Sequence, residues 1–416
     1  MEVKVVTRLF PRFQGIGRSR SPRLLGSVAG IAVGLLIAVT AIAAPLYPRP
    51  DPDPFYAPPP DLAAHRPGDV LDVRPLPPLP LFPGATVTLV EFRSTDSHGE
   101  PIAATTTILT PANHPPNGPL LSYQHFINAL GTDCAVSHLL YAGDTNLNTT
   151  TPILNVLMQQ GWSIALPDHL GPRFAFGAAR LGGQIVLDGI RAAKQLPALG
   201  VQNGPVAMTG YSGGGMATAW AAALQPSYAP DLRLAGAAIG GAPMNLLTMA
   251  EALGLEPHPA FGLAMAAAIG LEREYPDRVQ TSLYLNERGL EVRDAMANSC
   301  TNDILAVGAG GSAREFVTTT SIFERSEARA VVEENSVELY PGVPEMPIFE
   351  WHSPDDPLIP VAAINNTDRR WCAAGVPLQT LRVPGGEHLS AAVMGAPAVL
   401  GWLEGRVRGE PAPIAC

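Results

Sequence analysis

The sequence contains few charged residues and almost no lysine. Asp, Glu, Lys and Arg make up 15% of its 416 residues, whereas soluble domains usually have about 25%. Lys4 and Lys194 are the only two lysines, and the net charge is −10. A nucleic-acid-binding domain needs clustered Lys and Arg on a basic surface, so we exclude this class of function.

The sequence also has no internal repeat. Heptads are missing, and the 43 prolines and 41 glycines follow no period, which excludes a long coiled coil, a collagen and a repeat architecture. Hydrophobic residues make up 46% of the chain, which excludes a fully disordered protein. At roughly 150 residues per domain, the length fits one large domain or two smaller ones.

The first 43 residues have the pattern of a targeting segment. Six basic residues and one acidic residue precede an uncharged apolar run over 24–46, and Ala-Ile-Ala at 41–43 offers small residues for cleavage. This pattern predicts a secretory signal peptide over 1–43. An uncleaved membrane anchor is the alternative, because the apolar run is long. In both cases the remainder is exported, secreted or held in the cell envelope, and without residues 1–43 its net charge is −15.

Cysteine is scarce, and its spacing argues against a metal site. The four cysteines lie far apart and form no CxxC pair, whereas zinc ligands come in close-spaced pairs. In an exported protein an even number of cysteines favours two disulfides, and three pairings are open. The cysteines are Cys134, Cys300, Cys372 and Cys416.

Beyond the targeting segment, the composition divides the chain into a lead-in and a main domain. Residues 44–83 are rich in proline, which favours an extended lead-in over a helix or a central strand. Residues 84–416 form the main domain. It opens with a hairpin of two strands, 86–93 and 102–109.

After this hairpin, short apolar strands alternate with helices. This order predicts an α/β fold with a mostly parallel central sheet and helices on both faces. The alternation breaks over 246–345, a helix-rich stretch that we interpret as an inserted cap or lid over the carboxyl edge of the sheet. The helix that begins at residue 214 is expected to end before Pro226. Further strands are predicted at 120–124, 162–167, 205–211, 232–240, 347–353 and 378–383, and further helices at 152–160, 181–195, 361–373 and 389–404.

The most informative motif is Gly-Tyr-Ser-Gly-Gly at 210–214, which fits G-x-S-x-G. The string alone is weak, but it lies between a predicted strand and a predicted helix. In that context the motif holds a nucleophilic serine on a sharp, strained turn with small flanking residues. The hydroxyl of Ser212 would then lie above the positive end of the following helix. A glycine-rich turn without a catalytic role is the alternative interpretation.

A serine nucleophile needs a base that takes its proton. Three histidines follow Ser212 in the chain. His258 lies in the predicted cap. His352 comes earlier in the chain than every plausible acid at the end of a predicted strand. His388 comes directly after the strand predicted at 378–383, where the base belongs in the order serine, acid, histidine.

The base needs an acid that orients it and stabilises its charged form. Asp355 and Asp356 follow the strand predicted at 347–353. We favour Asp356, because the segment Asp-Pro-Leu-Ile-Pro at 356–360 fits the pattern D-x-x-[IV]-P. Asp355 remains the alternative, since the ordering rule cannot rank two adjacent carboxylates.

The oxyanion that forms during attack needs two hydrogen-bond donors. The N–H of Gly213, directly after the nucleophile, is expected to be one. The other should come from the loop at 126–129, after the strand predicted at 120–124.

These segments resemble the secretory lipase family, α/β-hydrolases typified by the fungal lipase A enzymes and with many actinobacterial members. The resemblance extends over nearly all of the chain beyond the targeting segment. Its most specific part is GYSGGGMATAWAAALQPSYAPDLRLAGAAIGGAP (210–243). Other matching segments are DPFYAPPPDLAAHRPGDVL (53–71), FRSTDSHGEPIAATTTIL (92–109), ALPDHLGP (165–172), DPLIP (356–360) and WCAAGVPLQTLRVPGGEH (371–388).

The resemblance implies hydrolysis of acylglycerols or other carboxylic esters, without a cofactor, and a helical cap that shapes the acyl pocket. It also implies the disulfides Cys134–Cys300 and Cys372–Cys416.

The chain departs from the family at two positions. Members often have Asp at the oxyanion position of the third-strand loop, where this chain has Asn128, and many have Gln where it has Gly213. A main-chain donor at Asn128 survives the first change, whereas a side-chain role is put in doubt. Both departures leave the reaction class intact and widen the range of substrates to be considered.

The sequence therefore predicts a secreted serine hydrolase that cleaves carboxylic esters, with acylglycerols as the favoured substrates. Ser212 attacks, His388 transfers the proton, Asp356 orients His388, and Gly213 with Asn128 binds the oxyanion. The expected partner is a lipid or ester substrate at a lipid–water interface, and no nucleic acid, metal or cofactor is expected. The alternatives are a short-chain esterase or acyltransferase on the same scaffold, and a catalytically inert cell-envelope protein of this fold.

Overall fold

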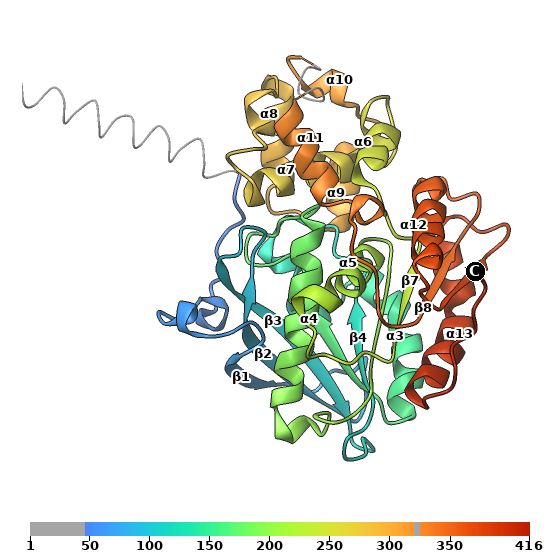
Figure 1. Cartoon of the computed structure of the whole chain (residues 1–416). Coiled ribbons are helices and arrows are strands. Elements are labelled where there is room, and N and C mark those ends of the chain that lie inside the picture. The colour runs from blue at the N-terminus through green and yellow to red at the C-terminus, as the bar shows by residue number, and fades with distance from the viewer. Residues whose placement is uncertain (1–45, 320–324) are drawn as a thin grey trace, which may run out of the picture. The chain divides into compact units, whose positions relative to one another are not determined.

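The computed structural model describes residues 46–319 and 325–416, and Figure 1 shows their elements. The predicted signal peptide or membrane anchor over 1–43 lies outside the described residues. Among the residues that are described, no helix is both long and apolar enough to cross a bilayer.

One sheet of nine strands forms the centre of the molecule. The strands are β1 (Val70–Leu76), β2 (Ala85–Thr95), β3 (Pro101–Pro111), β4 (Leu120–Gln124), β5 (Ser163–Pro167), β6 (Val206–Tyr211), β7 (Gly236–Gly240), β8 (Ile348–His352) and β9 (Leu378–Arg382). Their order across the sheet is β1-β2-β3-β5-β4-β6-β7-β8-β9. The pairs from β1 to β5 are antiparallel, and all pairs from β5 across to β9 are parallel.

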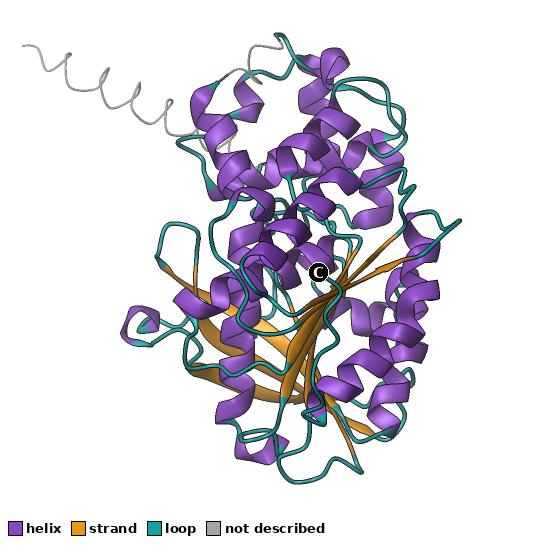
Figure 2. Cartoon of the chain, turned by 45° about the vertical axis from the view of Figure 1, so that its right-hand side comes forward, coloured by secondary structure: helices purple, strands orange, loops and turns teal. Residues whose placement is uncertain are grey.

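Helices cover both faces of this sheet (Figure 2). Those of one face are α4 (Ala179–Gln195), α5 (Gly213–Tyr228) and α12 (Val361–Ala373), and those of the other are α2 (Val136–Ala142), α3 (Thr145–Gln159) and α13 (His388–Val407). Each set packs its apolar side chains into a separate core. The strands β4 to β8 are almost entirely buried, as expected for parallel strands with helices on both sides. The predicted α/β architecture is confirmed.

A group of helices lies between β7 and β8 and gathers beyond one end of the sheet (Figure 1). Its members are α6 (Leu246–Gly254), α7 (Phe261–Glu274), α8 (Glu287–Met296), α9 (Thr301–Gly308), α10 (Ala313–Phe316) and α11 (Ser326–Glu334). The extended pairing described in this stretch is a single bridge between Leu285 and Val317. We call this group of helices the cap and the rest of the described chain the body.

The helix after Ser212 is longer than predicted. We expected an end before Pro226, but α5 includes this proline and continues to Tyr228. Pro226 has no N–H and therefore removes one hydrogen bond of the helix. The Ala229 N–H still donates to the Gln225 carbonyl at 2.9 Å, so the last turn of the helix forms around the proline.

The proline-rich lead-in also contains a strand that the sequence analysis did not predict. This strand, β1, lies at the edge of the sheet and pairs with β2 alone. An edge strand tolerates a proline, here Pro75, because one row of its backbone groups needs no partner in the sheet. Two short 3₁₀ helices, Pro54–Tyr56 and Leu62–Ala64, precede it.

Both disulfides that the family resemblance implies are present. Cys134 bonds to Cys300 and so joins the body to the start of α9 in the cap. Cys372, in α12, bonds to Cys416 at the end of the chain. The first disulfide closes a loop of 166 residues and the second a loop of 44 residues.

Candidate active site

Ser212 occupies a strained turn between β6 and α5. Its φ of +55° lies in the left-handed region, which residues other than glycine rarely adopt. A Cβ atom at Gly214 would lie 1.9 Å from the carbonyl oxygen of Gln124, and one at Gly210 would lie 2.4 Å from that of Gly214. The flanking glycines are therefore needed for close backbone packing, and the turn presents Ser212 at the N-terminus of α5.

His388 is the first residue of α13 and lies against a carboxylate. Its Nδ1 is 2.7 Å from Oδ2 of Asp356. Its Nε2 is buried and has no hydrogen-bond partner among the described residues. The imidazole is thus held at one nitrogen, and the other nitrogen is available to a reacting group.

Asp356 is fixed by its own loop. Its Oδ1 accepts hydrogen bonds from the N–H groups of Leu358 at 2.9 Å and Ile359 at 3.0 Å. Burial raises the pKa of the Asp356 carboxyl, but the hydrogen bond and charge of His388 and these two N–H groups outweigh it and hold the pKa below its ordinary value. A carboxylate that stays ionised beside the imidazole is what a triad acid requires.

Three other candidates from the sequence form no hydrogen bond with His388 among the described residues. Asp355, the alternative acid, is exposed. His352 is fully buried on β8, where its Nδ1 is 2.7 Å from Oε2 of Glu350. His258 lies in the cap, where its Nδ1 accepts a hydrogen bond from the Ala260 N–H at 3.1 Å.

Tyr211 supports the site, although the sequence analysis gave it no role. Its hydroxyl donates to the main-chain oxygen of His388 at 2.6 Å. The two rings lie with their centroids 5.1 Å apart. Tyr211 is the first of the two variable residues of the G-x-S-x-G motif, so the turn that carries Ser212 also holds the start of α13. The motif does not specify this residue, and only the packing identifies it.

The two predicted oxyanion donors lie next to each other. A Cβ atom at Gly213 would lie 2.5 Å from Oδ1 of Asn128, so the Asn128 carboxamide lies directly over Gly213. The main-chain N–H of Asn128 donates to Oγ1 of Thr301 at 3.3 Å. The carboxamide therefore faces the residue after Ser212, whereas the main-chain donor is engaged by the cap. Thr301 is a second residue that the sequence analysis missed.

An apolar cavity of about 210 Å³ adjoins this site. Ser212, Gly213 and Asn128 line one part of it, and most of the remaining wall comes from the cap. Six of its apolar wall residues are Leu247, Leu253, Ala268, Leu271, Val279 and Val332. A pocket with a few polar groups at one end and an apolar wall suits a ligand with a polar head and an apolar tail.

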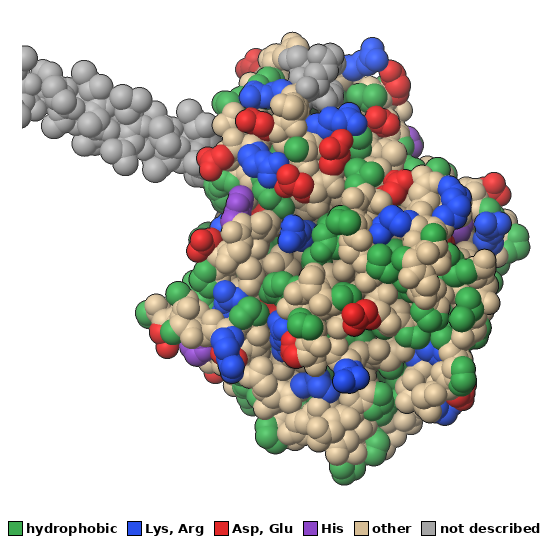
Figure 3. All heavy atoms as spheres, viewed as in Figure 1, with side chains coloured by type: hydrophobic (Ala, Val, Ile, Leu, Met, Phe, Trp, Pro, Cys, Tyr) green, Lys and Arg blue, Asp and Glu red, His purple; other side chains and the backbone are tan. Residues whose placement is uncertain are grey.

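The outer surface of the cap differs from this inner wall. Figure 3 shows acidic and basic side chains interspersed over the cap, and exposed ion pairs such as Arg278–Glu334, at 2.6 Å, which joins the turn after α7 to α11, lie on this surface. The cap thus presents apolar side chains to the cavity and charged ones to water. In the described part of the chain, no group of three His, Cys, Asp or Glu side chains is placed to hold a metal ion.

The sequence pattern of the Secretory lipase family matches residues 142–414, more than half of the chain. Lipase 5 of Candida albicans is 32% identical over 409 residues, which cover 92% of this chain and 87% of that protein. The probable trichothecene esterase SAT6 of Stachybotrys chartarum is 30% identical over 385 residues, which cover 85% and 76%. These similarities show the family and the class of reaction.

The solved structure of Candida antarctica lipase A has the same fold. It matches this chain with a TM-score of 0.82 at 28% identity, over 88% of this chain and 87% of that one. The predicted α/β-hydrolase fold is thereby confirmed. The chain belongs to the secretory lipase family and is a carboxylic ester hydrolase.

Proposed function

We propose that this hydrolase acts through a triad of Ser212, His388 and Asp356, and that acylglycerols are its substrates. One observation carries the proposal: His388 Nδ1 lies 2.7 Å from Asp356 Oδ2, while His388 Nε2 is buried without a hydrogen-bond partner among the described residues. A histidine with one nitrogen on a carboxylate and the other free is the arrangement of a general base. Ser212 follows Tyr211, whose hydroxyl bonds to His388, and is the group to be deprotonated.

In the proposed reaction, Ser212 Oγ attacks the ester carbonyl carbon while His388 Nε2 takes the hydroxyl proton. Asp356 keeps the proton on Nδ1 and stabilises the imidazolium that forms. The carbonyl oxygen becomes an oxyanion, which accepts hydrogen bonds from the Gly213 N–H and from Asn128. The C–O bond then breaks, and the alcohol leaves with the proton from His388. Water, deprotonated by the same histidine, cleaves the acyl-enzyme.

The apolar cavity supports a long acyl chain as the group bound beside Ser212. Each CH₂ group that leaves water contributes about 0.8 kcal/mol, so a wall of Leu, Val and Ala side chains favours longer chains over short ones. Acylglycerols at a lipid–water interface combine such chains with the ester bond. A short acyl chain would bury fewer CH₂ groups against this wall and gain less from it, and an acyltransferase would use the same acyl-enzyme with an alcohol in place of water.

The proposal includes export and the division of the chain. Residues 1–43 are the signal peptide or membrane anchor, 44–83 the lead-in, and 84–416 the catalytic domain with its cap over 246–345. The two disulfides support an oxidising compartment outside the cytosol, and we propose that the protein lies in the medium or the cell envelope.

One experiment tests the triad and the substrate together. Wild type and Ser212→Ala are compared on esters of increasing acyl length, including an emulsified triacylglycerol, and both are treated with a fluorophosphonate. We expect activity that rises with chain length, and labelling of Ser212, in wild type alone. Ser227→Ala is the matched control, because Ser227 is exposed at the far end of α5. Labelling elsewhere, or full activity of Ser212→Ala, would refute the triad, and activity on short chains alone would refute the acylglycerol substrate.

A further inference from the structure

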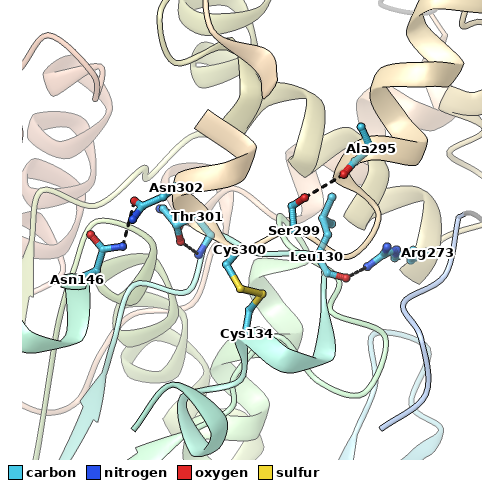
Figure 4. Close-up of a disulfide and its surroundings, with 10 residues drawn as sticks. Leu130, Cys134, Asn146, Arg273, Ala295, Ser299, Cys300, Thr301 and Asn302 are labelled. Carbon is cyan, nitrogen blue, oxygen red and sulfur yellow. Dashed lines mark hydrogen bonds between the residues drawn. A yellow bond between two sulfur atoms is a disulfide. The ribbon is translucent and has the colours of Figure 1, made fainter. Parts of the chain in front are cut away.

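Two segments far apart in the sequence meet beside the candidate active site. We call 128–134 the oxyanion loop and 298–301, at the start of α9, the docking segment of the cap. Figure 4 shows the disulfide that joins them, Cys134–Cys300. The Leu130 N–H also donates to the Ser299 carbonyl at 3.0 Å. A Cβ atom at Gly131 would lie 2.4 Å from the Asn298 carbonyl oxygen, so the two backbones are in direct contact.

A buried arginine of the cap fixes the same contact. Arg273, in α7, is fully buried. It donates to the carbonyl of Leu130 and to that of Ala297, each at 2.7 Å (Figure 4 shows the first). Burial lowers the pKa of Arg273 to about 10, so the guanidinium stays charged at neutral pH. The oxyanion loop and the docking segment are therefore held as one unit by a covalent bond, main-chain contacts and a charged donor.

Thr301 is the residue of the docking segment that reaches Asn128. Its Oγ1 accepts the Asn128 main-chain N–H at 3.3 Å. The Asn128 main-chain N–H is engaged by Thr301, whereas the Asn128 carboxamide lies over Gly213. Half a turn of the terminal side-chain torsion exchanges the oxygen and nitrogen of a carboxamide, so Nδ2 can be offered to an oxyanion there.

We propose that Thr301 is a positioning residue for the oxyanion hole. Its hydroxyl oxygen accepts a hydrogen bond from the Asn128 main-chain N–H and so fixes the position of Asn128. The Asn128 carboxamide can then donate through Nδ2 to the oxyanion, beside the Gly213 N–H. The cap then has a second role besides lining the cavity, because it sets the geometry of the reacting centre. This inference rests on the proposed triad and goes beyond it.

The role of the Asn128 side chain is tested by Asn128→Ala, which removes the carboxamide and keeps the main-chain N–H. Loss of one oxyanion donor typically lowers kcat by about 10²- to 10³-fold, and we expect a loss in this range with little change in KM. A main-chain donor would survive the substitution. A kcat within about threefold of wild type would therefore overturn the assignment of the carboxamide.

The role of Thr301 is tested by a pair of substitutions. Thr301→Val keeps the shape of the side chain but has no acceptor, and Thr301→Ser keeps the hydroxyl. We expect kcat of Thr301→Val to fall by about 10- to 100-fold at nearly constant KM, because a small misplacement of a reacting group has effects of this size. Thr301→Ser should recover to within about threefold of wild type, since it restores the acceptor. The rates are expressed per active site, counted by fluorophosphonate titration.

Asn302→Ala is the matched control. Asn302 is the next residue of α9, and its side chain accepts a hydrogen bond at 3.2 Å from Asn146 of α3, outside the oxyanion loop (Figure 4). It should leave kcat unchanged. Equal losses in Asn302→Ala and Thr301→Val, an unchanged Thr301→Val, or a Thr301→Ser that stays as slow as Thr301→Val would each overturn the positioning role. A wild type that fails to react with the fluorophosphonate would instead overturn the triad, and the inference with it.

Discussion

The body and the cap of this hydrolase contribute to the site in different ways. The residues assigned to the triad follow the carboxyl ends of β6, β8 and β9, so the order of the chain places them at one edge of the sheet. The cavity wall comes largely from α6, α7 and α11, and these helices meet only through tertiary packing. From this difference we infer that the proposed chemical step depends on the strand ends of the body, and the proposed choice of substrate on the helices of the cap.

The contact between the two regions complicates this division. Asn128 belongs to the body, but its main-chain N–H donates a hydrogen bond to Thr301 of the cap. Cys134 and Cys300 then hold the same two regions together. A substitution in the cap can therefore affect either substrate preference or the rate of the chemical step, and the rate constants tell the two apart.

The largest effect is expected at the acid of the body. Asp356→Asn keeps the shape of the side chain but removes the charge that stabilises the imidazolium, and it favours the wrong tautomer of His388. We expect kcat to fall by about 10⁴-fold. Asp355→Asn is the matched control because Asp355 is exposed, and it should retain kcat within about twofold. Similar losses in the two variants, measured on one soluble ester, would reopen the choice of acid.

The next effect compares the two disulfides. Replacing Cys134 and Cys300 together by serine removes a link that closes 166 residues and joins body to cap, whereas Cys372–Cys416 closes 44 residues at the chain end. The loss of chain entropy on cross-linking grows with loop length, so the first pair should lose about 1 kcal/mol more stability than the second. Denaturant unfolding of both double variants measures the difference. Only the double variant at Cys134 and Cys300 should also have a lower kcat. An equal kcat in both double variants would show that the contact between cap and body does not affect catalysis.

The sequence allowed the body to be predicted in more detail than the cap. The strand ends, the G-x-S-x-G turn, His388 and the acid loop follow from local patterns and chain order. The cap appeared only as a helix-rich stretch, and nothing in the sequence indicates that Thr301 reaches Asn128, because that contact joins residues far apart in the chain. Pro226 and β1 were misjudged for a related reason. A missing N–H is tolerated at a helix end and at a sheet edge, and both settings depend on the surrounding fold.

A pH-dependent effect distinguishes a carboxyl group of the body from one of the cap. Glu91, on β2, is buried, and its Oε1 has no hydrogen-bond partner among the described residues. Burial, aided by the nearby charge of Asp72, raises the pKa of Glu91 to about 7. Since the folded state then holds this proton more tightly than the unfolded state, the contribution to stability is complete below about pH 4.5 and is lost as the pH rises through about 7.

Glu91→Gln should therefore gain stability over wild type by about 1 to 3 kcal/mol between roughly pH 5 and pH 8. In the cap, Glu334 forms an exposed ion pair with Arg278, and Glu334→Gln should change stability by less than about 1 kcal/mol, in the destabilising direction. Thermal unfolding across this pH range tests both. A Glu91→Gln variant whose difference from wild type stays constant with pH would show that this carboxyl does not titrate there.

The last comparison concerns the cavity wall of the cap. Ala268, in α7, faces the cavity, so Ala268→Phe fills space that a long acyl chain would occupy. We expect kcat/KM for a long-chain ester to fall by about 10-fold relative to a short-chain ester, because pocket contacts of this size discriminate by about this factor. The burst of acyl-enzyme on the short ester should stay the same, since the strand ends are untouched. Ala306→Phe, on the exposed side of α9, controls for added bulk on the cap. If both esters slow equally in Ala268→Phe alone, this wall acts on the chemical step, and the cap contributes to catalysis beyond Thr301.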